Sequence, residues 1–196
     1  MKIENISLTI NGVNFLDQIS CNFDFNKIYA LVGDTSVNVL LRILCGLVSP
    51  TTGKVTTENN VTCGFFLNDM HFITDFNAQE TIEDISSKQL TKKEINELLN
   101  KLDLFKDSKL KISKYQENML KKLGILCTTL NNNKIILIED VFKGLLPSDI
   151  DMVRELFINL KSKGYLIILT GRKKEEFTYF ADKIYEIEKG IKNEIL

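Results

Sequence analysis

The chain has 196 residues, 44% of them hydrophobic, which is enough for one compact core, so we expect a single domain over residues 1–196. Its 25 basic and 26 acidic residues give a formal net charge of −1, which argues against the concentrated basic face of a nucleic-acid-binding protein. With only one histidine, His71, and no C-x-x-C pair, we expect no histidine-based catalytic triad and no metal site.

The sequence also argues against secretion and membrane insertion. The first ten residues lack the apolar stretch of a secretion signal, and no apolar run approaches the ~20 residues that a membrane span needs. The cysteines are flanked by apolar residues and are expected to be buried free thiols. We therefore expect a soluble protein of the cytoplasm with these four thiols: Cys21, Cys45, Cys63 and Cys127.

The N-terminal third predicts strands around one helix. Apolar and polar residues alternate over 2–20 around Asn11-Gly12, which is typical of a β-hairpin because a type I′ turn needs positive φ at both central positions. The apolar run 27–33 predicts a buried strand. Helical spacing of apolar residues predicts a helix over 39–48, and further strands are expected within 54–67.

The rest of the chain alternates helices and strands. We expect helices within 77–130, with caps at Thr91 and Ser113. Buried strands are predicted within 131–140 and over 165–170, separated by a helix over 147–164 that starts at a proline and ends at a glycine. The C-terminal part predicts a helix, a strand, a turn at Lys189-Gly190 and a final strand.

This alternation predicts an α/β fold with a mainly parallel sheet, to which the hairpin and the helical stretch are added. Four segments, in this order, resemble those of the ATP-binding subunit of ABC transporters: the Walker A strand, loop and helix (28–55), the Q-loop (64–85), the signature helix with Walker B and D-loop (112–149), and the H-loop with the closing strand (164–190). The resemblance implies a P-loop NTPase-like ABC ATPase domain, with an N-terminal antiparallel β part and a helical subdomain at about 77–130.

The phosphate-binding loop departs from the family pattern. A P-loop reads G-x-x-x-x-G-K-[ST], whereas the residues after Gly33 contain no second glycine and no lysine, and the loop is about two residues shorter. Asp34 places a negative charge where phosphate would lie, and we expect Thr35 or Ser36 to act only as a helix N-cap. The positional equivalents of nucleotide-binding residues are Gly33, Thr35, Ser36, Asn38 and, in the Q-loop, Asn68.

The remaining motifs of the family are also altered. Walker B ends in Asp then Glu in the family, but here Glu139 precedes Asp140, so a catalytic base would be one methylene short. The H-loop histidine is matched by Arg172, and the D-loop aspartate by Leu146. The L-S-G-G-Q signature is matched by residues 115–119, which include Gln116, Glu117 and Asn118.

Loss of these motifs together predicts a pseudo-ATPase subunit, for which no cofactor is expected. It would act by pairing with an intact ATP-binding subunit, a membrane permease, or both, at the inner face of the cell membrane. Because the family's dimers are held partly by sandwiched ATP, a monomer is expected when the chain is alone. Two alternatives stay open: an active ATPase with a divergent Mg-ATP site at Glu139 and Asp140, and a free-standing regulatory or immunity-type binding protein.

The sequence also predicts which aromatic and charged segments lie in the core and which lie at the surface. Phe65 and Phe66 are expected in the core, whereas residues 70–76 are equally consistent with core packing and with a groove for a partner helix. Lys121 and Lys122 on the signature helix are interpreted as part of a solvated face. The run 173–176 is interpreted as an exposed helix start.

Overall fold

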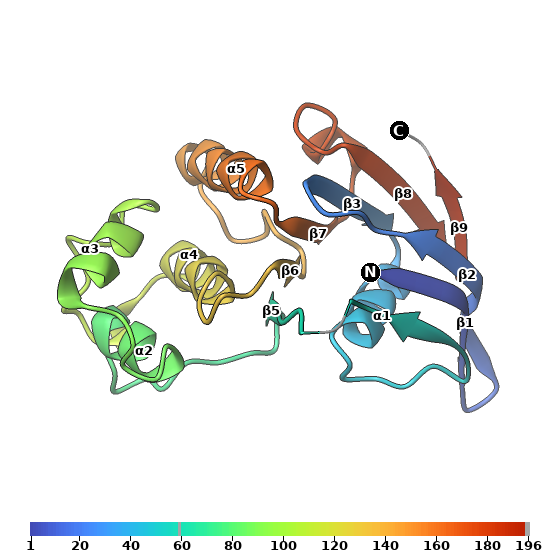
Figure 1. Cartoon of the computed structure of the whole chain (residues 1–196), viewed down its shortest axis with the longest axis horizontal. Coiled ribbons are helices and arrows are strands. Elements are labelled where there is room, and N and C mark those ends of the chain that lie inside the picture. Colours follow the sequence, from blue (N-terminus) through green and yellow to red (C-terminus); the bar gives the residue numbers. More distant parts are fainter. Residues whose placement is uncertain (59, 195–196) are drawn as a thin grey trace.

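The computed structural model, which describes residues 1–58 and 60–194, contains two β-sheets with helices between and beside them (Figure 1). The smaller sheet has the order β2-β1-β4 and the larger one the order β5-β6-β7-β3-β8-β9. The strands of the smaller sheet are β1 (Lys2–Ile10), β2 (Val13–Asn22) and β4 (Thr52–Thr56). Those of the larger sheet are β3 (Lys27–Gly33), β5 (Cys63–Phe66), β6 (Ile135–Ile138), β7 (Leu166–Gly171), β8 (Lys183–Glu188) and β9 (Ile191–Glu194).

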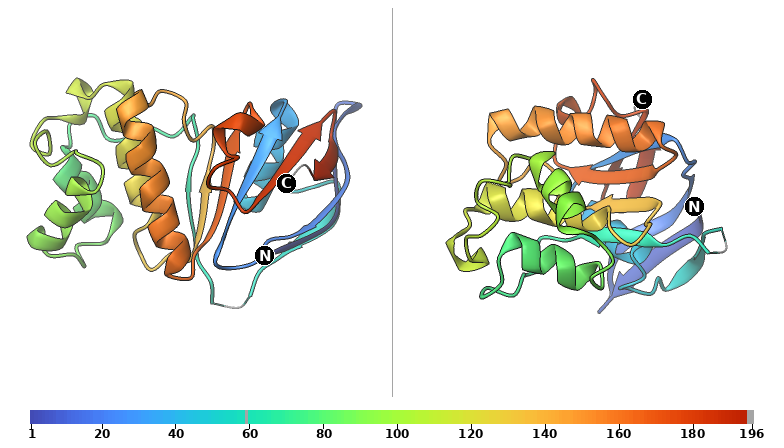
Figure 2. Two further views of the ribbon diagram at one scale, coloured as in Figure 1. Left: turned by 90° about the horizontal axis from the view of Figure 1, so that it is seen from above. Right: turned by 60° about the vertical axis from the view of Figure 1, so that its left-hand side comes forward.

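The helices lie on both faces of the larger sheet. They are α1 (Thr35–Leu44), α2 (Ala78–Ile85), α3 (Lys92–Asn100), α4 (Glu117–Thr128) and α5 (Pro147–Ser162), with short 3₁₀ turns η1 (Ile112–Lys114) and η2 (Lys174–Glu176). Figure 2 shows the resulting layers: α1 lies between the two sheets, and the other helices cover the opposite face of the larger sheet. Within the described ranges, no helix combines the length and hydrophobicity needed to cross a lipid bilayer.

Alternation along β3 shows how the sheet separates two cores. Ile28, Ala30 and Val32 pack with α4 and α5, whereas Tyr29 and Leu31 pack with α1 and the smaller sheet. All strands of the larger sheet pair in parallel except β9, which pairs antiparallel with β8. Successive strand residues point to opposite faces, so a strand buried on both faces needs an unbroken apolar run. The predicted α/β fold with a mainly parallel sheet is confirmed.

The predicted turns agree with the backbone conformation. Asn11 and Gly12 have φ of 51° and 78°, and Lys189 and Gly190 have φ of 50° and 77°, as two-residue hairpin turns require. Thr91 caps α3 in a capping box with Glu94, as predicted. All four cysteines are free thiols, with Cys21 buried and the other three half-buried.

Three element predictions are wrong. The helix expected over 39–48 is α1, which begins at Thr35 because Asp34 caps it, and ends at Leu44. Ser113 lies inside η1 and caps no helix, since α4 begins after Gln116. The C-terminal helix expected after residue 174 is only the 3₁₀ turn η2. Lys173, which precedes this turn, and most of the turn itself are exposed.

Gly64 on β5 allows α4 to approach the sheet, and we expect its replacement to be destabilising. A Cβ atom at Gly64 would lie 2.0 Å from the carbonyl oxygen of Thr128, at the end of α4. Backbone must then move, so Gly64→Ala should lower the free energy of unfolding by about 1–3 kcal/mol, as overpacking does. Urea unfolding measures this, with Cys63→Ala on the same strand as the control. Equal stability of the two variants would contradict the predicted close approach.

Candidate functional site

Asp34 occupies the N-terminus of α1, where a P-loop would hold phosphate. Its Oδ1 accepts a hydrogen bond from the backbone N–H of Ser36 at 2.8 Å, and its Oδ2 accepts one from the N–H of Lys189 at 2.9 Å. The N-cap is therefore Asp34, and the prediction that Thr35 or Ser36 caps this helix is wrong. An aspartate is among the preferred N-cap residues because its short side chain reaches these N–H groups.

The charge of Asp34 is stabilised by the same contacts. Burial raises the pKa of this carboxyl group, but the hydrogen bonds from Ser36 and Lys189 outweigh burial and hold the pKa below its usual value. The preceding residue, Gly33, has φ of +137°, and a Cβ there would lie 2.1 Å from the carbonyl oxygen of Ile187. The short loop is thus packed tightly against β8, with an ionised carboxylate at the start of the helix.

Glu139 and Asp140 follow β6, and their carboxylates meet the side chain and backbone of Asn68. Glu139 is buried, and its Oε2 accepts a hydrogen bond from the Asn68 backbone N–H at 2.8 Å. The Asp140 Oδ2 accepts a hydrogen bond from Asn68 Nδ2, also at 2.8 Å. Arg42 of α1 lies 3.5 Å from the Glu139 carboxylate and makes two hydrogen bonds to Asp69. The structure therefore brings together three of the predicted site residues.

Asn38 joins this group through Thr170 at the end of β7. The Asp140 backbone N–H donates to Thr170 Oγ1 at 2.8 Å, and Thr170 Oγ1 donates to Asn38 Oδ1 at 3.1 Å. Asn38 thus contributes a hydrogen bond within the protein. In the same first turn of α1, Thr35 is exposed and Ser36 is buried.

Lys121 of α4 is buried beside the two carboxylates. Its Nζ donates to the backbone oxygen of Glu139 at 2.6 Å and to Asn68 Oδ1 at 3.4 Å, and it lies 5.4 Å from the centre of the Phe66 ring. Lys122 is buried too, in an ion pair of 2.9 Å with Asp149. The interpretation of these lysines as a solvated face is wrong, because α4 is covered on both sides by the core and by α5.

The residues that match the signature motif contact the loop and helix after β6. Gln116 is the N-cap of α4 but makes no side-chain capping bond. The Glu117 side chain packs against Gly144, where an added Cβ would lie 2.7 Å from Oε1. Asn118 Nδ2 donates to Asp149 Oδ2 at 3.0 Å. These side chains therefore tie α4 to α5 within the same chain.

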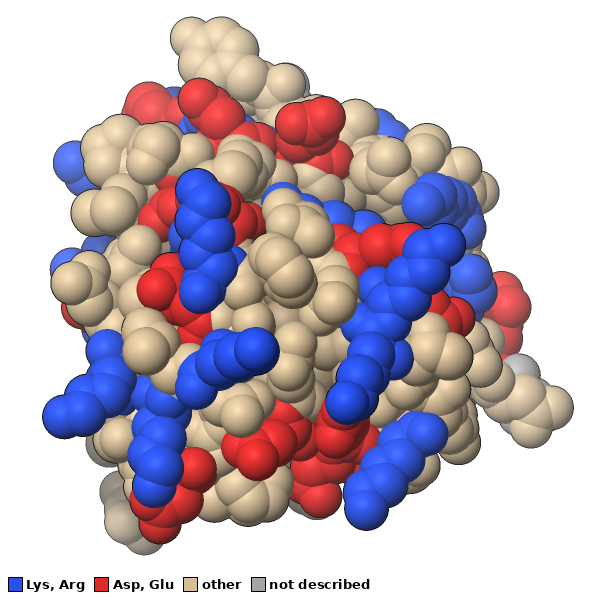
Figure 3. All heavy atoms as spheres, turned by 90° about the vertical axis from the view of Figure 1, so that its left-hand side faces the viewer, with Lys and Arg blue, Asp and Glu red and all other residues tan. Residues whose placement is uncertain are grey.

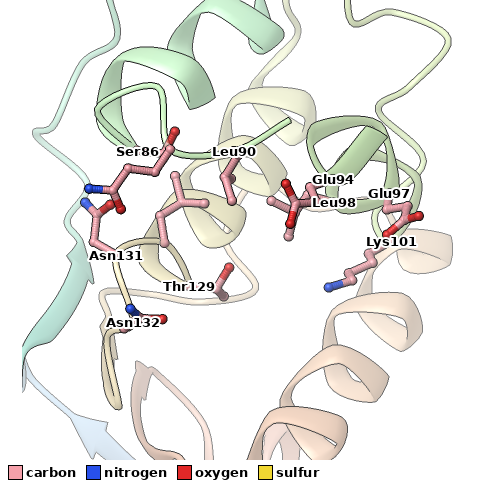
Figure 4. Close-up of a pocket in the computed structure, with 11 residues that line it drawn as sticks. Ser86, Leu90, Glu94, Glu97, Leu98, Lys101, Thr129, Asn131 and Asn132 are labelled. Carbon is pink, nitrogen blue, oxygen red and sulfur yellow. The ribbon is translucent and has the colours of Figure 1, made fainter. Parts of the chain in front are cut away.

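Two hollows lie in different parts of the molecule. One, of about 290 Å³, includes Asp140, Lys143 and Arg172, so it places the H-loop equivalent beside one of the two carboxylates. The other, of about 300 Å³, lies between α3 and the end of α4 and contains none of the predicted site residues (Figure 4). Asn131 stands at its edge and donates a hydrogen bond to the Ile85 carbonyl oxygen at 2.9 Å.

The segment after β5 divides between core and surface. Phe66 is buried and stacks on the half-buried Phe72, with ring centres 6.0 Å apart. Met70 and Ile73 are 43% and 55% exposed. Met70 lines an apolar hollow of about 290 Å³ together with Phe65, Phe66, Phe72, Gly124 and Cys127, whereas Ile73 follows Phe72 in the chain and is not part of the lining. Phe66 belongs to the core, as expected, while Met70 and Ile73 are available at the surface.

Charge on the outer face of α2 and α3 is mixed. Figure 3 shows this side of the molecule with lysine and arginine side chains interspersed with acidic ones. A surface that binds nucleic acid usually gathers basic side chains on one face. The view gives no support for a nucleic-acid partner on this side.

Several site residues were missed by sequence reasoning. Arg42 contacts the Glu139 carboxylate, and Lys121 contacts Asn68 and the backbone oxygen of Glu139. Thr170 accepts the Asp140 backbone N–H, and Lys122 pairs with Asp149. A lysine in a helix is normally solvated, so sequence spacing gave no sign that Lys121 and Lys122 are buried. For Thr170, the signal was its place at the end of a buried strand, where side chains of neighbouring parallel strands meet.

Comparison with known proteins agrees with this architecture. No protein-family model matches the chain. It is 25% identical over 200 residues to the lantibiotic transport ATP-binding protein SrtF of Streptococcus pyogenes, covering 97% of this chain and 87% of that protein. It is 26% identical over 200 residues to the ABC transporter ATP-binding protein MJ1023 of Methanocaldococcus jannaschii, covering 97% and 74%. Its relatives are ABC transporter ATP-binding proteins.

Solved structures give the same fold. The ATP-binding cassette MJ0796, in a dimeric post-hydrolysis state bound to ADP and Pi, superposes with a TM-score of 0.87 at 17% identity, covering 100% of this chain and 98% of that one. The structure of an ATP-binding subunit of an ABC transporter gives a TM-score of 0.85 at 18% identity, covering 99% of this chain and 89% of that one. The chain therefore has the P-loop NTPase fold of an ABC ATPase cassette.

Several groups that would face Mg-ATP in an ABC cassette make contacts within this chain. The Ser36 N–H at the start of α1 already donates to the Asp34 carboxylate, whose negative charge would repel a phosphate placed there. Arg42 and Asn68 take up the carboxylate oxygens that a magnesium ion would share.

The burial of Lys121 predicts that the stability of the protein depends on pH. Burial lowers the pKa of Lys121 to about 8, although Asp140, Glu139 and Glu117 oppose this change, and Lys143 adds to it. Arg42 lies beyond Glu139 on the other side. A lysine whose pKa is lower in the folded state than in the unfolded state, near 10.5, binds fewer protons when folded, so stability rises as pH increases through this window.

We expect the stability of the wild-type chain relative to Lys121→Met to increase between pH 8 and pH 10.5. Urea unfolding of both proteins at several pH values measures the difference, and the subtraction removes the titration of cysteines and tyrosines common to both. Lys93→Met, at an exposed helix position, should follow the wild type at every pH. A difference that stays constant with pH would contradict the burial of a charged ammonium at neutral pH.

Proposed function

We propose that this chain is a degenerate ATP-binding-type subunit of an ABC transporter, which does not hydrolyse ATP. It acts by pairing with an intact ATPase subunit, with a membrane permease, or with both, and it works at the inner face of the cell membrane through that permease. No ATP, magnesium ion or other cofactor is required for this role.

One observation carries the proposal: the Asp34 carboxylate accepts the Ser36 N–H at the start of α1 and the Lys189 N–H of the turn between β8 and β9. A P-loop uses such groups for phosphate, and its lysine supplies positive charge. Here the N-cap residue Asp34 carries a negative charge. The hydrogen bonds that hold its carboxylate in place also keep its pKa below the usual value. The names of the relatives, which are transport ATP-binding proteins, support the transporter context.

The alternative of an active ATPase rests on Glu139 and Asp140, which lie together at the end of β6. Their order is reversed relative to the family, and their oxygens accept bonds from Asn68. Hydrolysis by this pair would require Asn68 and Arg42 to release them. An active ATPase is therefore the second candidate function, and a test of Mg-ATP binding distinguishes it from the first.

Calorimetry with Mg-ATP is the first test. At millimolar nucleotide we expect no saturable heat, because phosphate would be repelled by Asp34 and receives no P-loop lysine. An intact ABC ATP-binding protein in the same buffer is the positive control. Saturable binding would contradict the proposal and favour the divergent ATPase, for which turnover lost in Glu139→Ala/Asp140→Ala is the further requirement.

The exposed residues after β5 give a test of the permease interaction. An apolar hollow lined by Met70 and Phe72, with the exposed Ile73 next in the chain, suits the apolar face of a partner helix. When the chain is co-expressed with the permease subunit encoded nearest to it, we expect the two to co-purify. Ile73→Asp should reduce the recovered permease at least about tenfold, because a carboxylate would have to be buried in the contact.

Ile191→Asp is the matched control for this experiment. Ile191 and Ile73 are each 55% exposed, but Ile191 lies on β9, away from the hollow. The control should co-purify like the wild type. Failure of the wild-type chain to retain any permease would contradict the proposed pairing and favour a free-standing regulatory protein.

A further inference from the structure

Asn68 is the meeting point of the two carboxylates and a buried ammonium. Its backbone N–H donates to Glu139, its side-chain Nδ2 donates to Asp140, and its Oδ1 accepts from Lys121. Three of its polar groups are therefore used in contacts within the chain. We call the set Asn68, Arg42, Lys121, Glu139 and Asp140 the carboxylate latch.

The cations of the latch come from opposite sides of the sheet. Arg42 reaches Glu139 from α1, which lies between the two sheets, at 3.5 Å. Lys121 reaches the backbone oxygen of Glu139 from α4, on the other face, at 2.6 Å. Since Glu139 is buried, its charge needs compensation within the protein. Two side-chain cations thus hold the position from both faces.

We propose that Arg42 and Lys121 act as built-in cations that hold the segment around Asn68 against Glu139 and Asp140 without a divalent metal ion. The inference rests on the proposed function, in that it treats the chain as one without a Mg-ATP site. Its consequence is that the link between α4, the Asn68 segment and the end of β6 stays formed in the absence of nucleotide. The neighbouring Met70 and Ile73 surface is then presented continuously.

The geometry favours this role over a simple surface ion pair. Lys121 is 5% exposed and Glu139 4% exposed, so solvent does not screen their interaction as it screens exposed pairs. Arg42 is also fixed by its two bonds to Asp69, at 3.0 and 3.1 Å. Because Asp69 follows Asn68 in the chain, Arg42 binds this segment directly as well as contacting Glu139.

Magnesium alone, without nucleotide, is the probe for the test. In the wild-type chain we expect the Asn68 amide to be protected from hydrogen exchange, and we expect 10 mM Mg²⁺ to change neither this protection nor the melting temperature. In Arg42→Met/Lys121→Met, protection should fall at least about tenfold, and Mg²⁺ should restore it. The melting temperature should then rise by about 3–5 °C if Mg²⁺ is present at ten times its dissociation constant.

Lys143→Met/Arg172→Met is the matched control. It removes two exposed cations that line a hollow with Asp140 but do not contact Asn68. We expect this double variant to behave like the wild type toward Mg²⁺. An equal response in this control would overturn the inference, since it would show a general charge effect in place of a latch.

The wild-type measurement decides the question even if the double variant fails to fold. Rapid exchange of the Asn68 amide, or a rise in melting temperature on adding Mg²⁺, would each overturn the inference. Lys121→Gln, which removes the charge and keeps a hydrogen-bond donor, provides a milder second variant and should show a smaller Mg²⁺ response than the double variant. Saturable Mg-ATP binding with an unchanged wild-type response to Mg²⁺ would refute the proposed function and leave the latch standing.

Discussion

Compensation of the negative charge at the end of β6 is the constraint on which the arrangement around it depends. Glu139 is buried, and an unpaired buried charge is costly, so the structure must bring donors or cations to it. They come from three places: Arg42 of α1, Asn68 after β5 and Lys121 of α4. The same contacts that satisfy the charge therefore also set the two helical layers and the Asn68 segment relative to the sheet.

A side-chain cation differs from a bound ion in ways that matter for function. A bound ion stabilises a protein only in proportion to its concentration relative to its dissociation constant. A lysine or arginine of the chain is present in every folded molecule and is positioned by the packing of its own helix. Under the proposed function, a cassette compensated in this way would keep one arrangement whatever the nucleotide supply and would present a constant surface to its partners.

Much of the fold could be predicted, because strands and turns leave local signals. The apolar runs of β3, β6 and β7, the positive-φ turns at Asn11-Gly12 and Lys189-Gly190, and the cap at Thr91 depend on residues within a few positions of each other. The buried lysines could not be predicted in this way. Lys121 and Lys122 are buried only because Glu139, Asn68 and Asp149 lie opposite them, and these partners are 18 to 53 residues away in the sequence.

The start of α1 shows how the fold persists after the phosphate site has changed. The first N–H groups of any helix need acceptors, and in a P-loop the bound phosphate supplies them. In this chain Asp34 supplies one from its own side chain and ties the same carboxylate to the turn between β8 and β9. The helix can then begin at Thr35 and pack between the sheets with no ligand present. The phosphate of an active cassette serves both the helix and the reaction, whereas the Asp34 carboxylate serves the helix, and in our proposal its charge keeps phosphate away.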